Sequence, residues 1–596
     1  MSQLRLFAEE RKPSPAVGLD VSLADAAGLL ASAPPGATIG LDIETTSGDP
    51  TMKAFLPERA GIAGIGVWCP WVERGFYFPL RHRHGPNLDA ALARDLLGPF
   101  LVSRPWAAYN GKFEMRFLDF HGWPLSRKVR CSFVGAHLLD ENASKKLADV
   151  APRYLGEEKM GDEIKRWLKT AGTEDYGDLP VDLAARYCVQ DARLAYRLDQ
   201  TFAPELERHG LGPLFDLEMR VLPELAAMEA RGHLIDLDFL MQMEPRVRAE
   251  RDELAARACA VLGRAVDLGS PAQLRDVFYA QLGLVPTGAT GKGAPSVDDD
   301  ALSAIDHPFA AAVLAWRRVA KKHSTYLEPL VRHHVRGVIH ASINDCGAAS
   351  GRMSMSDPNL QNVKDEPDIR SLYVARPGWT NMYWDYSQIQ FRIFAHYAGD
   401  RRVQAAYRDD PDADFHRLCL EMMPRLGTRD RAKTVNLALL FGMGAALLAK
   451  QLGCSVEEAK SARALYYASL PLVRAFQYRV EQRLLNPGYI FSLYGRRRRN
   501  CKAHIAFNAL HQSVEADMMR EAIALVGPMV REVGGNLLLP IHDELIAEVP
   551  TQDAGELRAI SKQATDAMVG VSRLSIPVRC KTEFTTTTWA DKKGLI

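Results

Sequence analysis

Hydrophobic positions follow two different spacings along this chain, and the change from one to the other predicts where strands give way to helices. Apolar runs at 38–44 and 60–68 are typical of strands, whereas 183–198 has the spacing of a helix. This alternation, between about 36 and 200, predicts an α/β domain.

The rest of the chain combines both patterns. Amphipathic helical segments run from about 214 to 333 and are interrupted by a glycine-rich loop at 287–295. Strands are predicted near 380 and 541, on either side of a mainly helical block between about 403 and 520. Because 596 residues exceed what one hydrophobic core organises, we expect several domains.

Composition narrows the class of protein only a little. Hydrophobic residues make up 47% and charged residues 25%, as in soluble globular proteins. The net charge of +1 does not by itself indicate a polyanionic partner, although acidic sites and basic faces can cancel in the sum. Basic clusters at 317–322 and 496–499 are either solvated surface or contacts to nucleic acid.

The chain carries no sign of export or of a membrane partner. Its nine cysteines form no C-x-x-C pair, which indicates reduced thiols. The N-terminus lacks an apolar signal region, and no apolar stretch approaches membrane-spanning length. We therefore expect a cytoplasmic protein.

Two acidic motifs stand out in the second half of the chain. The stretches 385–389 (DYSQI) and 541–545 (IHDEL) each set acidic residues in an apolar, strand-like run. A buried carboxylate is costly unless it is paired with a proton, a hydrogen bond or a metal ion. Each acid alone could merely end a strand, but together Asp385 and Asp543 predict a divalent metal site on one sheet.

A second group of acids is spread over the first 200 residues. Asp42 and Glu44 are two apart on a predicted strand and so project from one face, where like charges repel unless a cation lies between them. Tyr187 and Asp191 are four apart, on one face of a predicted helix. Glu114 ends the stretch NGKFE and supplies a fourth carboxylate.

In order and approximate spacing these residues resemble the D-x-E, N-x-x-x-D and Y-x-x-x-D motifs of 3′–5′ proofreading exonucleases. The resemblance implies a ribonuclease H-like domain with two divalent metal ions about 4 Å apart. Asp42, Glu44, Glu114 and Asp191 would be catalytic ligands, with Tyr187 orienting the attacking water. Glu114 replaces the usual aspartate, so we expect exonuclease activity with an altered rate or metal preference.

From about 200 to 596 the chain is similar to the DNA polymerase I family (family A). The similarity rests on the two acidic motifs and on the segments 228–236, 322–326 and 350–362, in the family's order. It implies an α/β and α+β multidomain protein, in which a right-hand polymerase follows the exonuclease domain. The expected divisions are the exonuclease domain with a short N-terminal extension (1–205), the start of the palm and the thumb (206–337), the palm (338–405), the fingers (406–520) and the C-terminal part of the palm (521–596).

The resemblance also implies roles for the acidic motifs. Asp385 and Asp543 would hold two Mg²⁺ ions, one at the primer 3′ hydroxyl and one on the incoming triphosphate, and Mn²⁺ can substitute. The backbone carbonyl of Tyr386 would be a further metal ligand, and Glu544 a supporting catalytic acid. Mg²⁺ suits this role because it keeps octahedral oxygen coordination and shares phosphate oxygens.

A nucleotide site is expected on a helix over 429–442. Its residues 429, 433, 437 and 441 form one stripe, with a basic end for phosphates and an apolar end for base and sugar. An ordinary amphipathic helix with a basic surface end is the alternative. By resemblance the nucleotide contacts are Gln390, His416, Arg429, Lys433, Leu437 and Phe441, with Lys433 also catalytic. The DNA contacts, mostly in the minor groove, are Arg352, Gln361, Asn508, Gln512 and His542.

Several positions depart from the family pattern. Gln390 replaces the glutamate that gates the sugar, and Phe441 replaces the tyrosine that usually bonds it. We therefore expect a steric gate with relaxed sugar discrimination, which Gln390→Glu combined with Phe441→Tyr should tighten. Leu437 predicts poor use of dideoxynucleotides. Glu515 replaces an alanine, and an exposed position without a role is expected for it.

Only about 35 residues precede the exonuclease pattern, so we expect no 5′ nuclease domain. The compact size resembles a phage replicative polymerase. The expected partners are primer-template DNA, dNTPs and replisome proteins, with the chain as a monomer. Two alternatives stay open. One is a single-subunit RNA polymerase-like enzyme, which would lack a D-x-E exonuclease. The other is a DNA-binding scaffold with degenerate catalytic sites.

Overall fold

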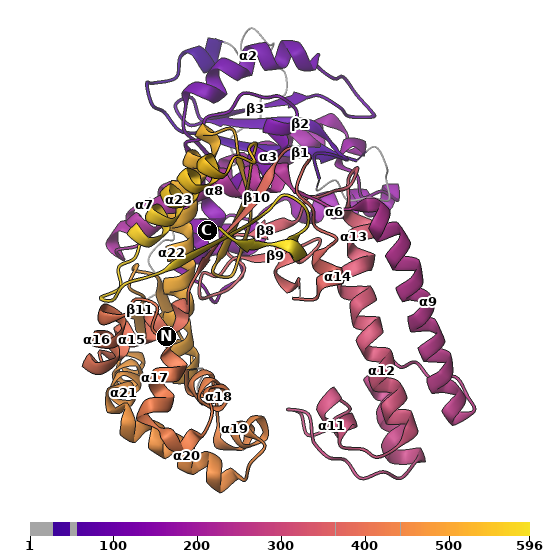
Figure 1. Ribbon diagram of the computed structural model, residues 1–596. Coiled ribbons are helices and arrows are strands. Elements are labelled where there is room, and N and C mark those ends of the chain that lie inside the picture. Colours follow the sequence, from indigo (N-terminus) through magenta and orange to yellow (C-terminus); the bar gives the residue numbers. More distant parts are fainter. Residues whose placement is uncertain (1–27, 48–55, 364, 441–442, 596) are drawn as a thin grey trace.

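The computed structural model describes residues 28–47, 56–363, 365–440 and 443–595, and it is a mixed α/β multidomain fold built around two five-stranded sheets (Figure 1). The first sheet has the order β3-β2-β1-β4-β5, with β1 to β3 antiparallel and β4 and β5 parallel to β1. Its strands are β1 (Ile39–Thr46), β2 (Gly61–Cys69), β3 (Arg74–Pro79), β4 (Trp106–Ala108) and β5 (Val129–Cys131). The two apolar runs predicted as strands are confirmed as β1 and β2.

The long helix α7 (Val181–Arg208) packs across β1, β2 and β3. Its close approach depends on glycine, since a Cβ on Gly40 would lie 2.2 Å from the carbonyl oxygen of Ala192. Every residue of β2 is buried, which explains its continuous apolar run. We call the first sheet and its helices the first body. Besides α7, its helices are α2 (Ala90–Ser103), α3 (Gly111–Phe120), α4 (Ser132–Leu139), α5 (Leu147–Leu155) and α6 (Gly161–Ala171).

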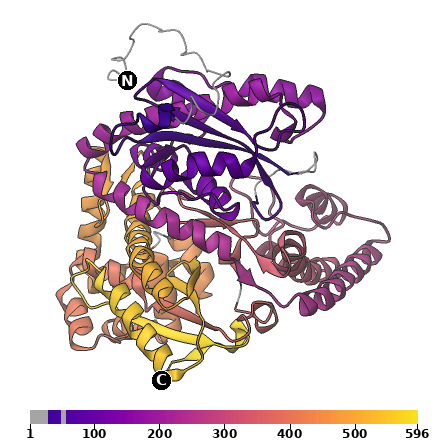
Figure 2. The same cartoon turned by 90° about the horizontal axis from the view of Figure 1, so that it is seen from above.

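The second sheet is antiparallel throughout, in the order β13-β14-β10-β15-β16. Three helices pack around it and one another: α8 (Gly212–Arg231), α22 (Ala503–Glu532) and α23 (Ala554–Gly570). Figure 2 shows the first sheet and this C-terminal part on opposite sides of the molecule. The strands are β10 (Thr380–Tyr386), β13 (Asn536–Ile541), β14 (Glu544–Val549), β15 (Cys580–Thr585) and β16 (Lys593–Gly594).

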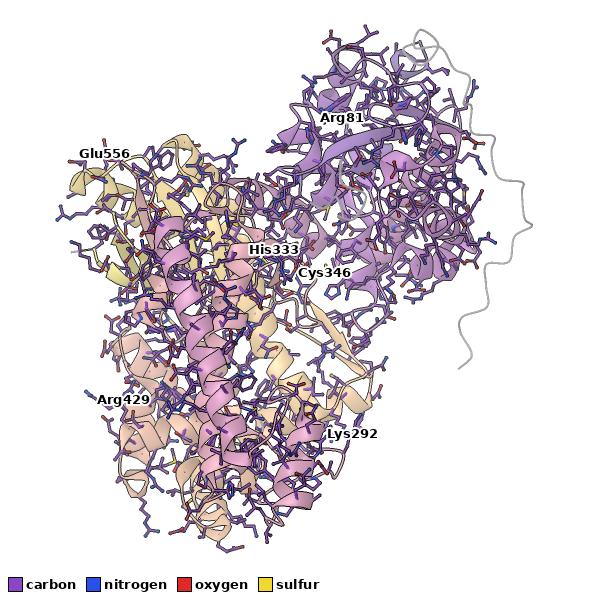
Figure 3. The ribbon with its side chains drawn as sticks, turned by 90° about the vertical axis from the view of Figure 1, so that its right-hand side faces the viewer. Arg81, Lys292, His333, Cys346, Arg429 and Glu556 are labelled. Atoms are coloured by element: carbon purple, nitrogen blue, oxygen red, sulfur yellow. The ribbon has the colours of Figure 1, made fainter. Side chains whose placement is uncertain are left out.

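Two helical arms extend from this sheet on opposite sides (Figure 1). Figure 3 labels Lys292 on one arm and Arg429 on the other. At their tips Lys450 forms an ion pair with Asp300 at 2.5 Å. One arm contains α9 (Leu237–Leu262), α11 (Asp299–Ser303), α12 (Pro308–Lys322) and α13 (Glu328–His333). The other contains α15 (Ile389–Ala398), α16 (Arg401–Asp409), α17 (Phe415–Met422), α18 (Arg429–Leu440), α19 (Ala445–Leu452), α20 (Val456–Ser469) and α21 (Pro471–Leu485).

The predicted helical block contains a strand pair that the sequence pattern did not indicate, β11 (Tyr489–Phe491) and β12 (Arg497–Arg499). Short pairs also join β6 (His233–Leu234) to β7 (Val338–Ile339) and β8 (Ser342–Asn344) to β9 (Ser354–Ser356). The domain ranges stay predictions, although three of their limits, 205, 405 and 520, fall inside α7, α16 and α22. Among the described residues, no helix combines the length and apolar character needed to cross a membrane.

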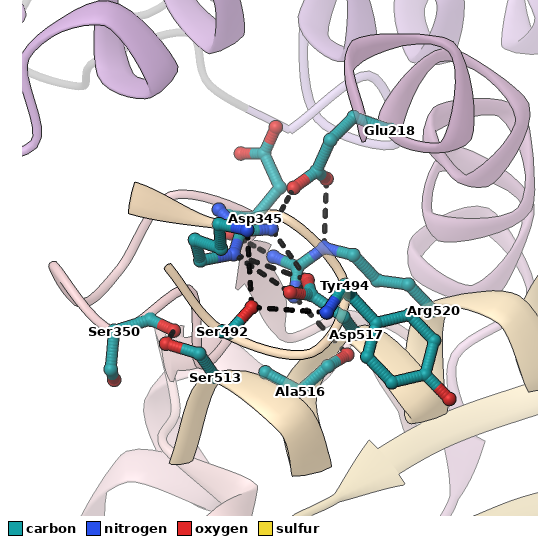
Figure 4. A network of polar contacts seen from close by, with 10 residues as sticks. Glu218, Asp345, Ser350, Ser492, Tyr494, Ser513, Ala516, Asp517 and Arg520 are labelled. Carbon is teal, nitrogen blue, oxygen red and sulfur yellow. Dashed lines mark hydrogen bonds and ion pairs between the residues drawn. The ribbon is translucent and has the colours of Figure 1, made fainter. Parts of the chain in front are cut away.

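The arginine run at 496–499 is neither solvated surface nor a free basic face. Arg496 is 3% exposed, and its Nη2 donates to Glu218 at 2.6 Å and to Asp517 at 2.7 Å. Figure 4 labels Glu218 and Asp517 in this network, together with Arg520, which also donates to Glu218 at 2.8 Å. Arg497 donates to the carbonyl oxygen of Leu139, at the end of α4. The run therefore joins the second sheet's helices to the first body.

This buried cluster gives a stability prediction. Arg496→Ala removes the guanidinium between Glu218 and Asp517, and the uncompensated charges should lower the free energy of unfolding by about 3–5 kcal/mol. Arg425, which is exposed, provides the control Arg425→Ala, expected to change it by under about 0.5 kcal/mol. Denaturant unfolding checks both. Equal unfolding midpoints for the two variants would contradict the prediction.

Candidate active sites

The two acidic motifs of the second half meet where the inner strands β10 and β14 of the second sheet end and begin. We call this end of the two strands, with Asp385, Asp543 and Glu544, the acidic edge. Asp385 is the penultimate residue of β10 and lies opposite Glu544, the first residue of β14. The expected strand over 541–545 is only partly correct, because His542 and Asp543 form the turn between β13 and β14. His542 has φ 56°, in the left-handed region that tight turns use. This turn brings Asp543 next to β10.

A backbone hydrogen bond ties the two motifs together. The N–H of Tyr386 donates to the carbonyl oxygen of Asp543 at 3.1 Å. The Tyr386 side chain is buried and its hydroxyl donates to the carbonyl oxygen of Met568 at 2.7 Å. Glu544 forms an ion pair with Lys592 at 2.7 Å. The position of the motifs is thus determined by the sheet and not by a mobile loop.

The electrostatics of this edge suit a divalent cation. Burial raises the pKa of Asp385 to about 6, and the charge of Glu544 adds to the effect. Burial raises the pKa of Asp543 to about 8, and the charges of Asp385 and Glu515 add to this effect. Carboxylates held this close without a cation favour their protonated forms. The residues present therefore fit a metal site made of oxygen ligands.

These shifts predict a pH-dependent affinity for Mg²⁺. Metal binding requires ionised carboxylates, so the affinity should rise as the pH rises through about 6 to 8. The metal-free protein should lose stability as the pH rises from 3.8 to about 8. In this range folded Asp543 holds a proton that the unfolded chain releases. Calorimetric Mg²⁺ titrations at several pH values check the first effect. An affinity that is independent of pH would contradict it.

The expected nucleotide residues lie on the arm that contains α18. Arg429 begins α18, and its Nε donates to Asp414 at 2.6 Å, while Lys433 is exposed one turn further on. His416 is 4% exposed, and its Nδ1 lies 3.0 Å from the side-chain nitrogen of Asn436. Leu437 belongs to α18, but its side chain and all of Phe441 lie outside the described residues.

The expected DNA residues come from four segments of the chain. Asn508 and Gln512 are one turn apart on α22, and His542 lies in the exposed turn beside Asp543. Gln361 donates through Nε2 to the carbonyl oxygen of Met353 at 3.2 Å. Arg352 lies in the loop between β8 and β9. The fold therefore spreads these residues over α22, the turn between β13 and β14, the loop before β9 and the short helix at Leu360–Asn362.

Glu515 is not exposed, and that expectation is wrong. It is 2% exposed on α22 and accepts from Nη2 of Arg352 at 2.6 and 2.7 Å. It also accepts from Nε2 of Gln390 at 3.1 Å. No pattern in the sequence indicates this contact, because Arg352 and Glu515 are 163 positions apart.

The second group of acids also converges, on the first sheet. Asp42 and Glu44 come from β1, Glu114 from the first turn of α3 and Asp191 from α7. Glu44, Glu114 and Asp191 are each at most 6% exposed. One oxygen each of Glu114 and Asp191 is buried with no hydrogen-bond partner among the described residues.

Burial raises the pKa of Asp42 to about 8, and the neighbouring charge of Asp191 adds to the effect. Burial and the charge of Asp42 likewise raise the pKa values of Glu44 and Glu114 well above their usual range. Four carboxylates in a buried cluster, two of them with unpaired oxygens, fit a site for divalent cations.

Two residues near this cluster were missed. Lys159, in the loop before α6, forms an ion pair with Asp191, and its ammonium lies 4.6 Å from the centre of the Tyr187 ring. Cys188 offers a ligand atom within 4.8 Å of ligand atoms of Asp42 and Glu44. In the sequence Lys159 lies between the motif that ends at Glu114 and the motif that begins at Tyr187. Its distance from either motif along the chain does not indicate a role. Cys188 adjoins Tyr187 and could have been found from that position.

Comparison with known proteins gives a family match and a structural match. A family model described as DNA polymerase family A matches residues 237–591. The thermostable DNA polymerase I of Thermus filiformis is 34% identical over 65% of this chain, and the DNA polymerase I of Chloroflexus aurantiacus is 29% identical over 98%. This chain spans 49% and 65% of the lengths of these two relatives.

The structural match is the POL domain of Pol1 from M. smegmatis, in complex with DNA primer-template and dNTP. It has a TM-score of 0.80 and 27% sequence identity, and the alignment covers 96% of this chain and 99% of that chain. The match therefore includes both sheets and both arms described above.

Proposed function

The chain belongs to DNA polymerase family A, and on that basis we propose that it copies DNA by extending a primer with deoxynucleoside triphosphates. The observation that carries the proposal is the junction of the two acidic motifs, where Tyr386 and Asp543 are hydrogen-bonded at 3.1 Å. The bound primer-template and dNTP of the M. smegmatis relative support the same substrates. Primer extension on a labelled template tests it.

We assign the parts of a right-hand polymerase to this fold. The second sheet is the palm, the arm with α9 and α12 is the thumb, and the arm with α15 to α21 is the fingers. The acidic edge then lies on the palm between the two arms, with α18 on the fingers. This arrangement puts the proposed nucleotide residues on an element separate from the metal ligands.

The palm residues have distinct tasks in this proposal. Asp385, Asp543 and the backbone carbonyl of Tyr386 would hold Mg²⁺ ions, which activate the primer 3′ hydroxyl and stabilise charge on the triphosphate. Glu544, paired with Lys592, supports them. Arg429 and Lys433 bind phosphate oxygens, since a guanidinium provides a planar donor fork and an ammonium a compact charge.

Lys433 should act on the chemical step. Lys433→Ala removes a cation that stabilises charge developing on the transferred phosphate, so the single-turnover rate should fall about 10²–10³-fold with DNA affinity unchanged. Arg431→Ala, at another exposed residue of α18, is the control. Rapid-quench incorporation and DNA titration separate the two effects. A normal rate with weaker DNA binding would contradict the assignment.

We propose a second activity, 3′–5′ exonucleolytic proofreading, for the first body. It is supported by the cluster of four carboxylates, of which Glu44, Glu114 and Asp191 are buried, and by Tyr187, whose ring contacts Lys159. Metal ions held by Asp42, Glu44, Glu114 and Asp191 would polarise the scissile phosphate. Tyr187 would orient the attacking water.

The alternatives are less well supported. The match to a DNA polymerase family model argues against a single-subunit RNA polymerase-like enzyme. The raised pKa values of Asp42 and Asp543 argue against a scaffold with degenerate sites, because buried carboxylates held together have a cost that metal binding relieves. Phage origin, replisome partners, the monomeric state, cytoplasmic location and dideoxynucleotide use stay predictions.

A further inference from the structure

Glu515 connects three elements at the palm. It projects from α22 and accepts two hydrogen bonds from Arg352, at 2.6 and 2.7 Å, and one from Gln390, at 3.1 Å. Arg352 belongs to the loop between β8 and β9, and Gln390 to the first turn of α15. These residues are separated from Glu515 by 163 and 125 positions, so only the folded chain brings them together.

The contacts restrict both partners. An ionised carboxylate only accepts hydrogen bonds, so the amide nitrogen of Gln390 must face Glu515 and its amide oxygen must face away. The Nε of Arg352 is buried with no hydrogen-bond partner among the described residues. The Arg352 guanidinium donates through Nη2 to both carboxylate oxygens of Glu515. Glu515 thus determines how both side chains point.

The position of Glu515 relates these contacts to the acidic edge. Its hydrogen bond to Gln390 reaches the first turn of α15. Gln390 follows Asp385 by five positions, at the start of the helix that leaves β10. Glu515 therefore contacts the helix that directly follows the strand of Asp385.

We infer that Glu515 is a positioning residue for nucleotide selection, holding Gln390 toward the sugar of the incoming nucleotide and Arg352 toward the primer end. This inference rests on the proposed polymerase function. A buried carboxylate needs a compensating charge, which Arg352 supplies. In the family pattern the acid stands at position 390 and an alanine at 515. In this chain the acid is Glu515 on α22, which is hydrogen-bonded to Gln390.

One consequence reverses an expectation from the sequence. Gln390→Glu would put two carboxylates about 3 Å apart, where like charges strongly disfavour double ionisation. While Glu515 is present, Gln390→Glu should therefore impair nucleotide binding and should not tighten sugar discrimination. The same holds when Phe441→Tyr is added. Glu515→Ala in the same chain removes the conflict and should restore binding.

The test compares Glu515→Ala, Gln390→Glu and the double variant with the wild type. Glu521→Ala is the control, because Glu521 also lies on α22 and pairs with an arginine, Arg573, at 2.6 Å. KM and kcat are measured for single incorporation of dNTP and of the matching rNTP, and an unfolding midpoint is recorded for each protein. Loss of a hydrogen bond to a charged group corresponds to about 10–100-fold in binding.

Glu515→Ala should raise the KM for dNTP at least about tenfold and lower the dNTP preference over rNTP, with a smaller change in kcat. Gln390→Glu should show a similar loss, and the double variant should recover to within about threefold of the wild type. Glu515→Ala behaving like Glu521→Ala would overturn the inference, as would a double variant no better than Gln390→Glu. A wild-type protein that extends no primer would overturn the proposed function and this inference with it.

Discussion

Asp385→Asn is expected to lower the primer-extension rate at least about 10²-fold while DNA cleavage continues at the wild-type rate. The substitution keeps the size of the side chain but removes the charge that binds a divalent ion. The backbone hydrogen bond between Tyr386 and Asp543 does not involve this side chain, so the junction of the motifs should persist. Extension of a labelled primer with Mg²⁺ and dNTPs measures the effect.

The matched control is Asp409→Asn, at an exposed residue of α16, which should extend primers normally. Asp543→Asn should behave like Asp385→Asn, since both carboxylates are proposed ligands of the same metal site. Extension by Asp385→Asn at more than a tenth of the wild-type rate would contradict the assignment of the palm metal site.

The second large effect concerns the first body. Asp42→Asn should reduce 3′–5′ cleavage of a single strand at least about 10²-fold and leave primer extension unchanged. Asp42 lies among Glu44, Glu114 and Asp191, so its loss removes one ligand and part of the charge that attracts a cation. Cleavage of a 5′-labelled oligonucleotide with Mg²⁺ or Mn²⁺ measures this.

Asp95→Asn, at an exposed residue of α2, is the control and should cleave like the wild type. A comparison of the two metals also tests the role of Glu114, whose longer side chain is expected to alter metal preference. Cleavage by Asp42→Asn equal to that of Asp95→Asn would show that the carboxylate cluster does not carry the activity.

The sequence could predict what depends on local spacing. The apolar runs at 38–44 and 60–68 located β1 and β2, and the two-residue spacing of Asp42 and Glu44 put both on one strand. The four-residue spacing of Tyr187 and Asp191 put both on α7. Such patterns arise within one element, so no knowledge of the tertiary fold is needed to find them.

The remaining features depend on contacts between distant segments. The sequence 541–545 looks like a strand because its ends are apolar, yet the left-handed backbone of His542 makes it a turn. Four consecutive arginines suggest a solvated face, but Arg496 is buried between two acids contributed by α8 and α22. Glu515 looked unimportant because its partners lie far away along the chain. Backbone conformation decided the first case, and burial with ion pairing decided the other two.

The most direct test of the account is the fate of a 5′-labelled primer whose last base is mismatched to its template. With Mg²⁺ and dNTPs the wild type should give a full-length product in which the mismatch has been corrected, since it would remove the base and then extend. Asp42→Asn should retain the mismatch or stall, and Asp385→Asn should only shorten the primer. A wild-type product that keeps the mismatch, or one identical in all three proteins, would contradict a proofreading DNA polymerase.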